Sequence, residues 1–562
     1  MRKYFAPALG LALTFALTCL TPVMHGRKPV QTDQPQSPSR GSAAVDYTVN
    51  SLGDAPDADL ADGLCADASG SCTLRAAIEQ ASFEVFSDET IGFGVTGTIN
   101  LTGALPELST NVTISGPGAS LLFVRRNTGG DYRVFTVNGG VTASISGLTA
   151  SNGRPPVEGD FISTGGGGIL NHGTLALTDC AVSGNFTTSA ISANAFSDPV
   201  GAAGGGIHNK GTLTMTRCTV SDNVTDMGTR DRGGFGGINT PVGGGIFNSG
   251  TMTMTDCNVV GNRTREGSAA HVRGGDGGRG GGIFNSGVMT VTNCFVSRNR
   301  TGEGTVSFES FGQGTGGGGG AGGGIFNDSD MTILNSTVSD NVTGDGAGVT
   351  SGAAGSGGDG GGILNNRNLT MTNCTVSGNV TGRGGDGGSP SPDGNADGGD
   401  GGGISSPTNL SNLRMSQSTV VFNATGHAGS GSGRDGIGGG IHGEARYRSS
   451  IVARNLTPAS VEGRDMSITV NSSGFNLIGI GDGACCFISS DQVGTGSAPL
   501  DPDLGPLAGN GGPTPTHALL AGSPAIDKAR ARPRRPAGDD RPARTHAPVQ
   551  RQRDAARERG RP

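Results

Sequence analysis

The chain has 562 residues, of which 106 are glycine, four are tyrosine and none is tryptophan. Its net charge of −7 conceals an asymmetry, because 12 Lys/Arg and four Asp/Glu lie from Lys528 onward and the rest of the chain carries −15. An acidic body gives no reason to expect nucleic-acid binding. So much glycine would indicate disorder in a chain without repeats, but this chain is repetitive.

Residues 1–26 have the pattern of a secretory signal. Arg2 and Lys3 give a basic start, and residues 8–20 are an apolar run that is short for a membrane span. We therefore expect an exported protein, extracellular or associated with the cell surface, without a transmembrane segment in its mature form. Lipid attachment at Cys19 is the weaker alternative. Residues 27–44, with three prolines, are expected to be a linker.

Residues 45–152 are expected to form an N-terminal cap and the first turns of the fold. Cys65 and Cys72 enclose six polar or small residues. Export favours oxidation of such a pair, so we predict a disulfide, with two free thiols as the alternative.

A short amphipathic helix is expected over residues 74–81, with Thr73 as its N-cap. Arg75 and Glu79 would face water. Leu74, Ala77, Ile78 and Ala81 would face the core. Such a helix would cover the first open edge of the fold, which could otherwise pair with another chain.

Residues 153–448 contain one stretch written eight times, each copy beginning Gly-Gly-Gly-Ile. The repeat isoleucines are Ile169, Ile207, Ile246, Ile283, Ile325, Ile363, Ile404 and Ile441, at steps of 37 to 42 residues. A fixed period of this size is typical of a solenoid.

The phase of the apolar residues predicts the shape of each coil. Leu175 and Leu177 have odd numbers, whereas Cys180 and Val182 have even numbers. A strand cannot keep one face inward through such a slip, so a corner must separate two strands. The corner residues are Asp179, Arg217, Asp256, Asn293, Asn335, Asn373 and Gln417. Three short strands per coil, stacked in register, would make three parallel sheets around a narrow core, which is a β-helix.

Asparagine forms two further columns. They are Asn185, Asn223, Asn262, Asn299, Asn341, Asn379 and Asn423, and Asn171, Asn209, Asn248, Asn285, Asn327 and Asn365. We expect these residues to take the left-handed backbone of corners and to bond from coil to coil through their amides. The second column breaks at Ser406 and Gly443, as expected for terminal repeats.

Glycine-rich insertions separate the repeats and all leave after the same asparagine. They span 186–203, 224–242, 263–279, 300–321, 342–359, 380–400 and 424–437. We expect side excursions that form a fringe along one edge, either as a working face or as drift on a tolerant surface.

Several insertion aspartates are each followed by glycine. They include Asp276, Asp345, Asp359, Asp386, Asp397, Asp400 and Asp435. Calcium binding is the less favoured interpretation, because the β-roll nonapeptide is missing and Asp-Gly is ordinary turn chemistry. We expect no cofactor.

The coil cysteines Cys180, Cys218, Cys257, Cys294 and Cys374 share one inward column with two serines. Small core fillers are the favoured interpretation, and disulfides between adjacent coils are the alternative. The state of the vicinal pair Cys485 and Cys486 stays open.

No catalytic residues are predicted. A lyase needs carboxylates that hold calcium and a base, and a glycoside hydrolase needs a carboxylate pair. Neither cluster recurs on the strand faces, whose outward residues are mostly Thr, Ser and Asn. His208 and His442 point outward beside repeat isoleucines and are interpreted as solvated. The missing tryptophan also leaves few platforms for stacking sugars.

Residues 449–527 are expected to form the last coils and a closing module, and residues 528–562 a basic disordered tail. A reading-frame shift after Ile526–Asp527 is favoured over an authentic tail, because an arginine, proline and alanine bias begins there.

Three stretches resemble a known family. Residues 72–81, CTLRAAIEQA, resemble the CSLREA domain that opens many bacterial secreted β-helix proteins, with Thr73 and Ala76 in place of Ser and Glu. The GGGIxNxGTLTLT pattern resembles their pectin-lyase-like solenoids, and Asp501–Asp527 resembles their choice-of-anchor module. The resemblance implies a right-handed helix and an exported protein.

We thus expect an all-β, right-handed parallel β-helix with a short N-terminal capping helix. The favoured function is a monomeric, non-enzymatic surface or matrix protein, in which the loop fringe adheres to an extracellular glycan or cell-surface component. The alternative is a polysaccharide lyase or glycoside hydrolase that acts on an acidic glycan.

Overall fold

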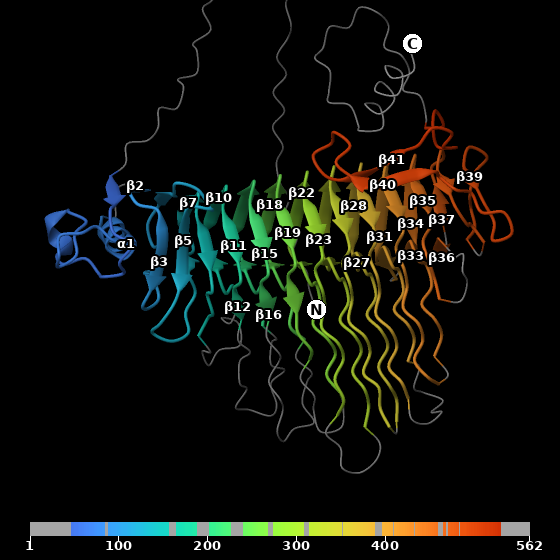
Figure 1. Ribbon diagram of the computed structural model, residues 1–562, viewed down its shortest axis with the longest axis horizontal. Helices are drawn as coiled ribbons and strands as arrows, with labels where there is room; N and C mark the ends of the chain where they lie inside the picture. Colours follow the sequence, from blue (N-terminus) through green and yellow to red (C-terminus); the bar gives the residue numbers. More distant parts are fainter. Residues whose placement is uncertain are drawn as a thin grey trace, which may run out of the picture. The chain divides into compact units, whose positions relative to one another are not determined.

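The computed structural model describes residues 46–84, 88–156, 165–187, 202–225, 240–267, 274–307, 314–350, 352–387, 396–407, 410–431, 433–458, 465–467, 470–482 and 484–529. The chain divides into Met1–Ala44 and Val45–Pro562, and all described residues belong to the second unit. The expected signal, the linker and residues 530–562 of the tail lie outside them. The described part is a right-handed parallel β-helix with one short α-helix at its N-terminal end (Figure 1).

Two sheets of 13 strands each run through the described residues. Sheet A contains β1 (Tyr47–Val49), β2 (Glu89–Phe93), β4 (Val112–Ser115), β7 (Thr142–Ser146), β10 (Thr174–Thr178), β14 (Thr212–Thr216), β18 (Thr251–Thr255), β22 (Val288–Thr292), β25 (Asp330–Leu334), β28 (Asn368–Thr372), β31 (Asn412–Ser416), β34 (Ala445–Arg448) and β37 (Val470–Ser472). Sheet B contains β3 (Gly97–Leu101), β5 (Leu122–Arg126), β8 (Thr149–Ser151), β11 (Ala181–Ser183), β15 (Thr219–Ser221), β19 (Asn258–Val260), β23 (Phe295–Ser297), β26 (Thr337–Ser339), β29 (Thr375–Ser377), β32 (Thr419–Val421), β35 (Ile451–Ala453), β38 (Leu477–Ile478) and β39 (Gln492–Val493).

The third side of the coil is sheet C. It contains β6 (Phe135–Val137), β9 (Ile169–Asn171), β13 (Ile207–Asn209), β17 (Ile246–Asn248), β21 (Ile283–Asn285), β24 (Ile325–Asn327), β27 (Ile363–Asn365), β30 (Ile404–Ser406), β33 (Ile441–Gly443) and β36 (Met466–Ser467). A short sheet D, which was not expected, contains β12 (Phe186–Thr187), β16 (Val224–Thr225) and β20 (Arg263–Thr264). Single bridges continue sheet D from Arg263 through Arg300, Val342, Val380 and Ala424 to Leu456.

The repeat dictates register because each residue pairs with its counterpart one coil later. Ile207 lies between Ile169 and Ile246, and Leu213 lies beside Met252. The inward columns are almost completely buried, with Val220 at 0% exposure. Burying each such side chain stabilises the fold by about 1.5–3 kcal/mol. The predicted three-strand coil is confirmed, and all seven predicted corner residues have φ between 50° and 57°.

The asparagine columns form ladders inside the coil. Asn185 Nδ2 donates to Asn223 Oδ1 at 2.9 Å, and the pattern repeats along the column as far as Asn455. In the second column Asn171 Nδ2 donates to Asn209 Oδ1, and Ser406 replaces the last amide acceptor. The expectation that these asparagines adopt the left-handed backbone is wrong. In the first column the preceding residue does so, as at Gly184 (φ 62°), which turns the asparagine amide inward.

Helix α1 (Leu74–Phe83) begins at Thr73, whose Oγ1 accepts the Ala76 N–H at 3.0 Å. Leu74 and Ile78 join the same buried cluster as the first strands, so the helix continues the core at this end. Arg75 and Glu79 do not face water as predicted. Arg75 pairs with Asp54 at 2.9 Å, and Glu79 accepts the backbone N–H of Asp57 at 2.7 Å, because the segment before the helix folds over it.

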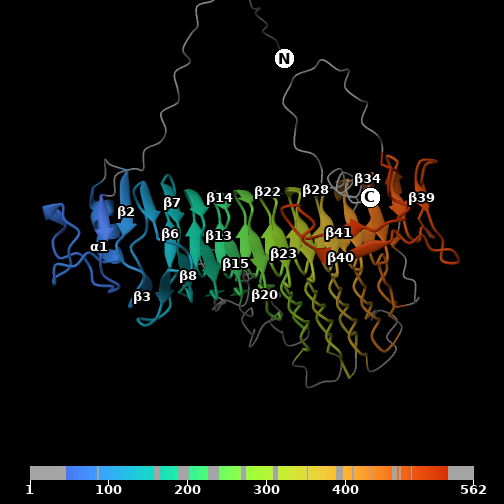
Figure 2. The same cartoon turned by 45° about the horizontal axis from the view of Figure 1, so that its top comes forward.

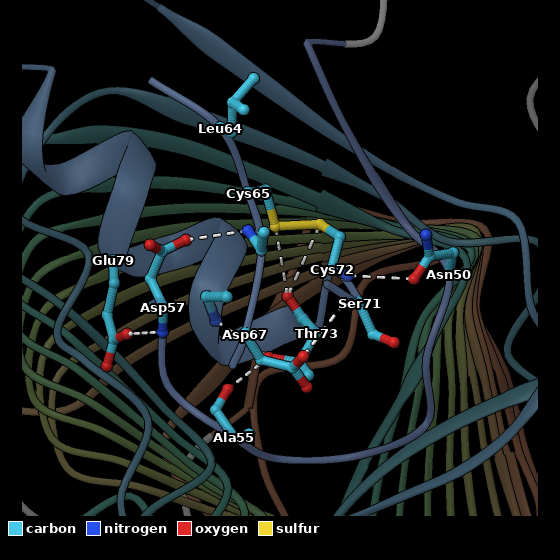
Figure 3. Close-up of a disulfide and its surroundings, with 12 residues drawn as sticks. Asn50, Ala55, Asp57, Leu64, Cys65, Asp67, Ser71, Cys72, Thr73 and Glu79 are labelled. Atoms are coloured by element: carbon cyan, nitrogen blue, oxygen red, sulfur yellow. Dashed lines mark hydrogen bonds between the residues drawn. A yellow bond between two sulfur atoms is a disulfide. The ribbon is translucent and has the colours of Figure 1, made fainter. Parts of the chain in front are cut away.

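A disulfide joins Cys65 to Cys72 beside the start of this helix (Figure 3). The Cys72 N–H donates to Asn50 Oδ1 at 3.0 Å, and Thr73 Oγ1 donates to the Ala55 carbonyl at 2.6 Å. A short 3₁₀ helix, η1 (Leu60–Asp62), lies in the same segment. These bonds and the disulfide tie the segment to α1 and β1.

The closing segment forms an antiparallel hairpin of β40 (Leu504–Ala508) and β41 (Thr516–Leu519). The hairpin, red in Figure 2, returns over the outer face of sheet B. Thr337 Oγ1 donates to the Pro515 carbonyl at 2.6 Å, and His517 Nε2 lies 2.8 Å from Ser377 Oγ. The hairpin therefore acts as a strap across the coils of β26 and β29.

Candidate functional site

The glycine-rich insertions build an ordered structure, which we call the glycine layer. It comprises residues 264–267, 274–280, 300–307, 314–322, 342–350, 352–360, 380–387, 396–401, 424–431 and 433–438. Each coil contributes one outgoing and one returning segment, which extend together from one edge of the sheets (Figure 1). The expected one-sided fringe is present, and its segments also bond to one another, which the sequence did not indicate.

Hydrogen bonds in the layer recur every third residue. The N–H groups of Thr301 and Gly304 donate to carbonyls of the next outgoing segment at 3.1 and 2.8 Å. Gly277 and Gly280 do the same between returning segments. The N–H of Thr305 instead crosses to the returning segment of the preceding coil. A three-residue period without internal bonds is the geometry of polyproline II, here stabilised by bonds to neighbouring segments.

Glycine is required where the segments cross. A Cβ on Gly317 would lie 2.0 Å from the Gly275 carbonyl oxygen, and one on Gly344 would lie 1.8 Å from the Gly302 oxygen. The adjacent Gly318 faces outward, and its Cβ would meet nothing closer than 3.4 Å. The dense glycine therefore reflects close backbone approach, as at a collagen axis.

From Thr264 onward, a threonine two residues after each asparagine of the first column anchors the layer. Thr301 Oγ1 donates to the Gly320 carbonyl at 2.7 Å and accepts the Gly344 N–H at 2.9 Å. Thr343 and Thr381 repeat both contacts one and two coils later. Sequence reasoning missed this role, although the recurring Asn-x-Thr spacing is visible. The same motif is a glycosylation acceptor where it is exposed, but these asparagines are 0% exposed.

The seven Asp-Gly aspartates named from the sequence cap backbone N–H groups at 2.7–2.9 Å. Six of them reach the next coil, as when Asp276 accepts from Gly318 and Asp397 accepts from Arg434. Asp435 accepts from Ala428 within its own loop. These carboxylates accept hydrogen bonds from backbone N–H groups that have no backbone carbonyl as acceptor. Over the described ranges no group of three or more His, Cys, Asp or Glu is placed to hold a metal ion.

The outward positions of the outgoing segments carry a charged row. It contains Glu303, Asp345, Arg383, Asp386 and His427, all exposed. Glu303 pairs with Arg300 and Arg383 pairs with Asp386, each at 2.7 Å. Since the backbone beneath is bonded on both sides, this row is held at fixed spacing.

A cluster of charged residues in the layer surrounds Asp400, which is 6% exposed. Arg434 donates from Nη1 to Asp400 Oδ1 at 2.8 Å and from Nη2 to Asp400 Oδ2 at 2.7 Å. His442 is 9% exposed, not solvated as predicted, because the returning segments cover the outer face of sheet C. Burial lowers the pKa of His442, although Asp400 opposes this shift. Burial also raises the pKa of Asp359 to about 6.

This cluster does not have the geometry of a catalytic relay. Ser405 Oγ lies 3.4 Å from His442 Nδ1, and Asp400 lies 3.8 Å from the same nitrogen. In a serine–histidine–acid relay, the serine bonds one ring nitrogen of the histidine and the carboxylate bonds the other. Here both lie on the side of Nδ1.

His208 begins a column of rings on the outer face of sheet C. It is 5% exposed, and burial lowers its pKa to about 3, so the expectation of a solvated ring is wrong. Its ring meets Phe247 edge-on at 4.8 Å, and Phe284 stacks on Phe326 at 4.7 Å. Gly165 lies directly over His208, where a Cβ would be 2.2 Å from Nδ1. The column is therefore packing between sheet and covering segment.

An open hollow of about 400 Å³ lies on the outer face of sheet B near its N-terminal end. It is lined by Thr98, Phe123, Arg125, Thr149, Ser151, Asn152, Ser183 and Gly184. The strap of β40 and β41 contacts sheet B farther along, at β26 and β29. Sequence reasoning did not single out any of these residues.

The five coil cysteines are free and buried in the structure. Burial raises the pKa of Cys374 to about 12, so its thiol stays neutral. Cys485 and Cys486 are free and exposed, with their sulfurs 3.0 Å apart. As far as the chain is described, none of its helices has the length and apolar character needed to cross a membrane.

Comparisons with known proteins find similarity only among solved structures. No family model matches the chain, and no curated protein matches it. The Dettilon tailspike protein (gp208) is 13% identical with a TM-score of 0.32, over 75% of this chain and 64% of the tailspike. The mannuronan C-5 epimerase AlgE6 A-module of Azotobacter vinelandii is 10% identical with a TM-score of 0.32, over 80% of this chain and 98% of the module. The AlgE4 A-module is 13% identical with a TM-score of 0.31, over 80% and 100%. At these values the similarities assign no activity to this chain.

Proposed function

We propose that this protein is an exported, non-enzymatic binding protein of the cell surface or extracellular matrix, and that it adheres through the glycine layer. One observation carries the proposal: hydrogen bonds from coil to coil hold the exposed row from Glu303 to His427 in fixed positions. A surface ordered before it meets its partner loses less conformational entropy on binding. The repeated row also suits a repetitive partner such as a glycan.

The charges of the layer support binding better than catalysis. Asp400 is neutralised by Arg434, and the other insertion aspartates that the structure describes cap backbone groups. A polysaccharide lyase or hydrolase needs a carboxylate or base that is free to act on the substrate. Export rests on the basic and apolar start of the chain. The resemblance of residues 72–81 and 501–527 to the CSLREA and choice-of-anchor modules adds support.

A binding screen on immobilised extracellular glycans and on whole cells tests the proposal. The triple variant Glu303→Gln, Arg383→Gln, Asp386→Asn should weaken binding at least tenfold without changing the thermal midpoint. The control Asp330→Asn, Arg414→Gln alters charges on the outer face of sheet A and should bind like the wild type. Equal binding by all three proteins would exclude the layer as the adhesive face. New ultraviolet absorbance from unsaturated uronates would establish a lyase instead.

A further inference from the structure

The hollow on sheet B combines an aromatic ring with a cation on one strand. Phe123 and Arg125 are two residues apart on β5, so both side chains point away from the core. Phe123 is 37% exposed, and Arg125 is exposed. Thr98 and Thr149 flank Phe123 on the neighbouring strands, and Ser151 lies beside Arg125.

Arg125 differs from its neighbour Arg126 in having no partner. Arg126 donates to the carbonyls of Asn152 and Gly130 and lies 3.8 Å from Asp131. The Arg125 guanidinium has no ion pair or hydrogen bond within the described ranges. Its five donors are thus directed to solvent, next to the exposed ring.

The chemistry of the lining selects a ligand class. A guanidinium binds a carboxylate through two parallel hydrogen bonds. A phenyl ring packs against the C–H face of a pyranose, while the hydroxyl groups at the edge of the sugar remain solvated. The hydroxyls of Ser151 and Ser183 are neutral and can bond sugar hydroxyls. The lining contains no carboxylate that would repel an anion.

We propose that this hollow binds a uronate unit of an acidic polysaccharide, with its carboxylate on Arg125 and its ring face on Phe123. The site lies on other residues than the glycine layer and stands independently of it. It would give the protein a specific anchor for acidic glycans.

Isothermal titration of the full-length protein with a uronate hexasaccharide tests this inference. Arg125→Gln and Phe123→Ala should each lower the affinity at least tenfold, and Arg125→Lys should retain part of it, because lysine keeps the charge but loses the planar fork. Methyl esterification of the hexasaccharide should have the same effect as Arg125→Gln. The matched control is Arg414→Gln, another exposed, unpartnered arginine, on sheet A, and it should leave the affinity unchanged.

Three outcomes would overturn the inference. They are no binding by the wild type, unchanged affinity in Arg125→Gln, and an equal loss in Arg414→Gln, which would indicate general electrostatics. A sulfated hexasaccharide of equal charge that binds as tightly would reject the uronate class. Because the Glu303, Arg383 and Asp386 substitutions should leave uronate affinity unchanged, failure of this site and failure of the layer are separable.

Discussion

The Nδ2 amide of Asn455 donates to the Oδ1 atom of Asp465 at 2.8 Å, so the longest asparagine ladder ends on a buried carboxylate. The Asn455 N–H donates to the same oxygen at 2.9 Å, and the Ile480 N–H donates to Oδ2 at 2.8 Å. Every amide in the ladder is oriented the same way and directs its N–H end toward Asp465. The ladder thus partly offsets the cost of burying a charge.

Stability should fall as the pH rises from about 4 to about 6. Burial raises the pKa of Asp465 to about 6, so the folded protein holds a proton that the unfolded chain releases near pH 4. The loss should be about 2–3 kcal/mol and stop above pH 6. Urea melts at several pH values should show it. Asp465→Asn should remove about half of the slope, because the pKa of Asp359 is also raised to about 6 and contributes over the same range. A variant that keeps the wild-type slope would contradict this assignment.

Breaking the ladder in its middle should cost much more than removing an exposed amide. Asn299 Oδ1 accepts both the N–H and the Nδ2 of Asn262, so Asn299→Ala leaves two buried donors unpaired. The expected loss is about 2–6 kcal/mol. Asn258→Ala, on the solvent face of β19, should change stability by less than about 0.5 kcal/mol. Denaturant midpoints compare the two variants, and similar losses would mean that the ladder does not contribute.

Neighbouring glycines of the layer should respond oppositely to alanine. Gly317→Ala places a methyl group 2.0 Å from a carbonyl oxygen and should cost about 1–3 kcal/mol or more. Gly318→Ala has room and should be neutral or stabilise by up to about 1 kcal/mol, because it restricts the unfolded chain. Calorimetric melting temperatures of the two variants test whether the segments approach each other closely at Gly317. Equal midpoints would show that the segments are not packed at this spacing.

A charge introduced into the core should destabilise the protein much more than a charge on the outer face of a strand. Val338 is 1% exposed in sheet B, and Val338→Asp should cost several kcal/mol and unravel adjacent coils. Thr332 points outward on β25, so Thr332→Asp should cost well under half as much. Comparable urea midpoints would contradict the inward and outward assignment.

Shortening residues 300–321 to about five residues should do more than change loop entropy. Closure alone would shift stability by about 1 kcal/mol. The deletion also removes bonds to both neighbours, such as Gly277 N–H to the Gly318 carbonyl and Gly319 N–H to the Ser356 carbonyl. We expect an unchanged far-ultraviolet β signal, because the core columns remain. The free energy of unfolding should fall by several kcal/mol, because each lost bond contributes about 0.5–1.5 kcal/mol. A change of only about 1 kcal/mol would show that the layer adds little stability.

The solenoid could be predicted from the sequence because its core positions are occupied by a regular pattern of apolar side chains. The slip between Leu177 and Cys180 predicts a corner, and Asp179 has the left-handed φ of 53° that such a corner needs. In the first asparagine column, the left-handed backbone lies one residue before the position predicted, as at Gly184. Both a corner and an inward ladder suit asparagine, and only the backbone distinguishes them.

The glycine layer could not be predicted because its bonds join backbone atoms. A period of three among glycines leaves no apolar pattern, and the best clue is the threonine two after each asparagine, such as Thr301. His208 and His442 were expected to be solvated because nothing indicated that a segment covers sheet C. The hollow was missed because the sequence does not distinguish Arg125 from Arg126.

The layer also bears on digestion of the protein. Long glycine-rich loops are ordinarily the first places that a protease cuts, because it must bind an extended stretch through main-chain groups. Here those groups already bond to the adjoining coils, as when Gly304 bonds to Asp345 and Gly346 to Arg383. Cleavage within the layer must therefore wait until a segment detaches from both neighbours. We therefore expect proteases to cut these hydrogen-bonded segments more slowly than free glycine-rich loops.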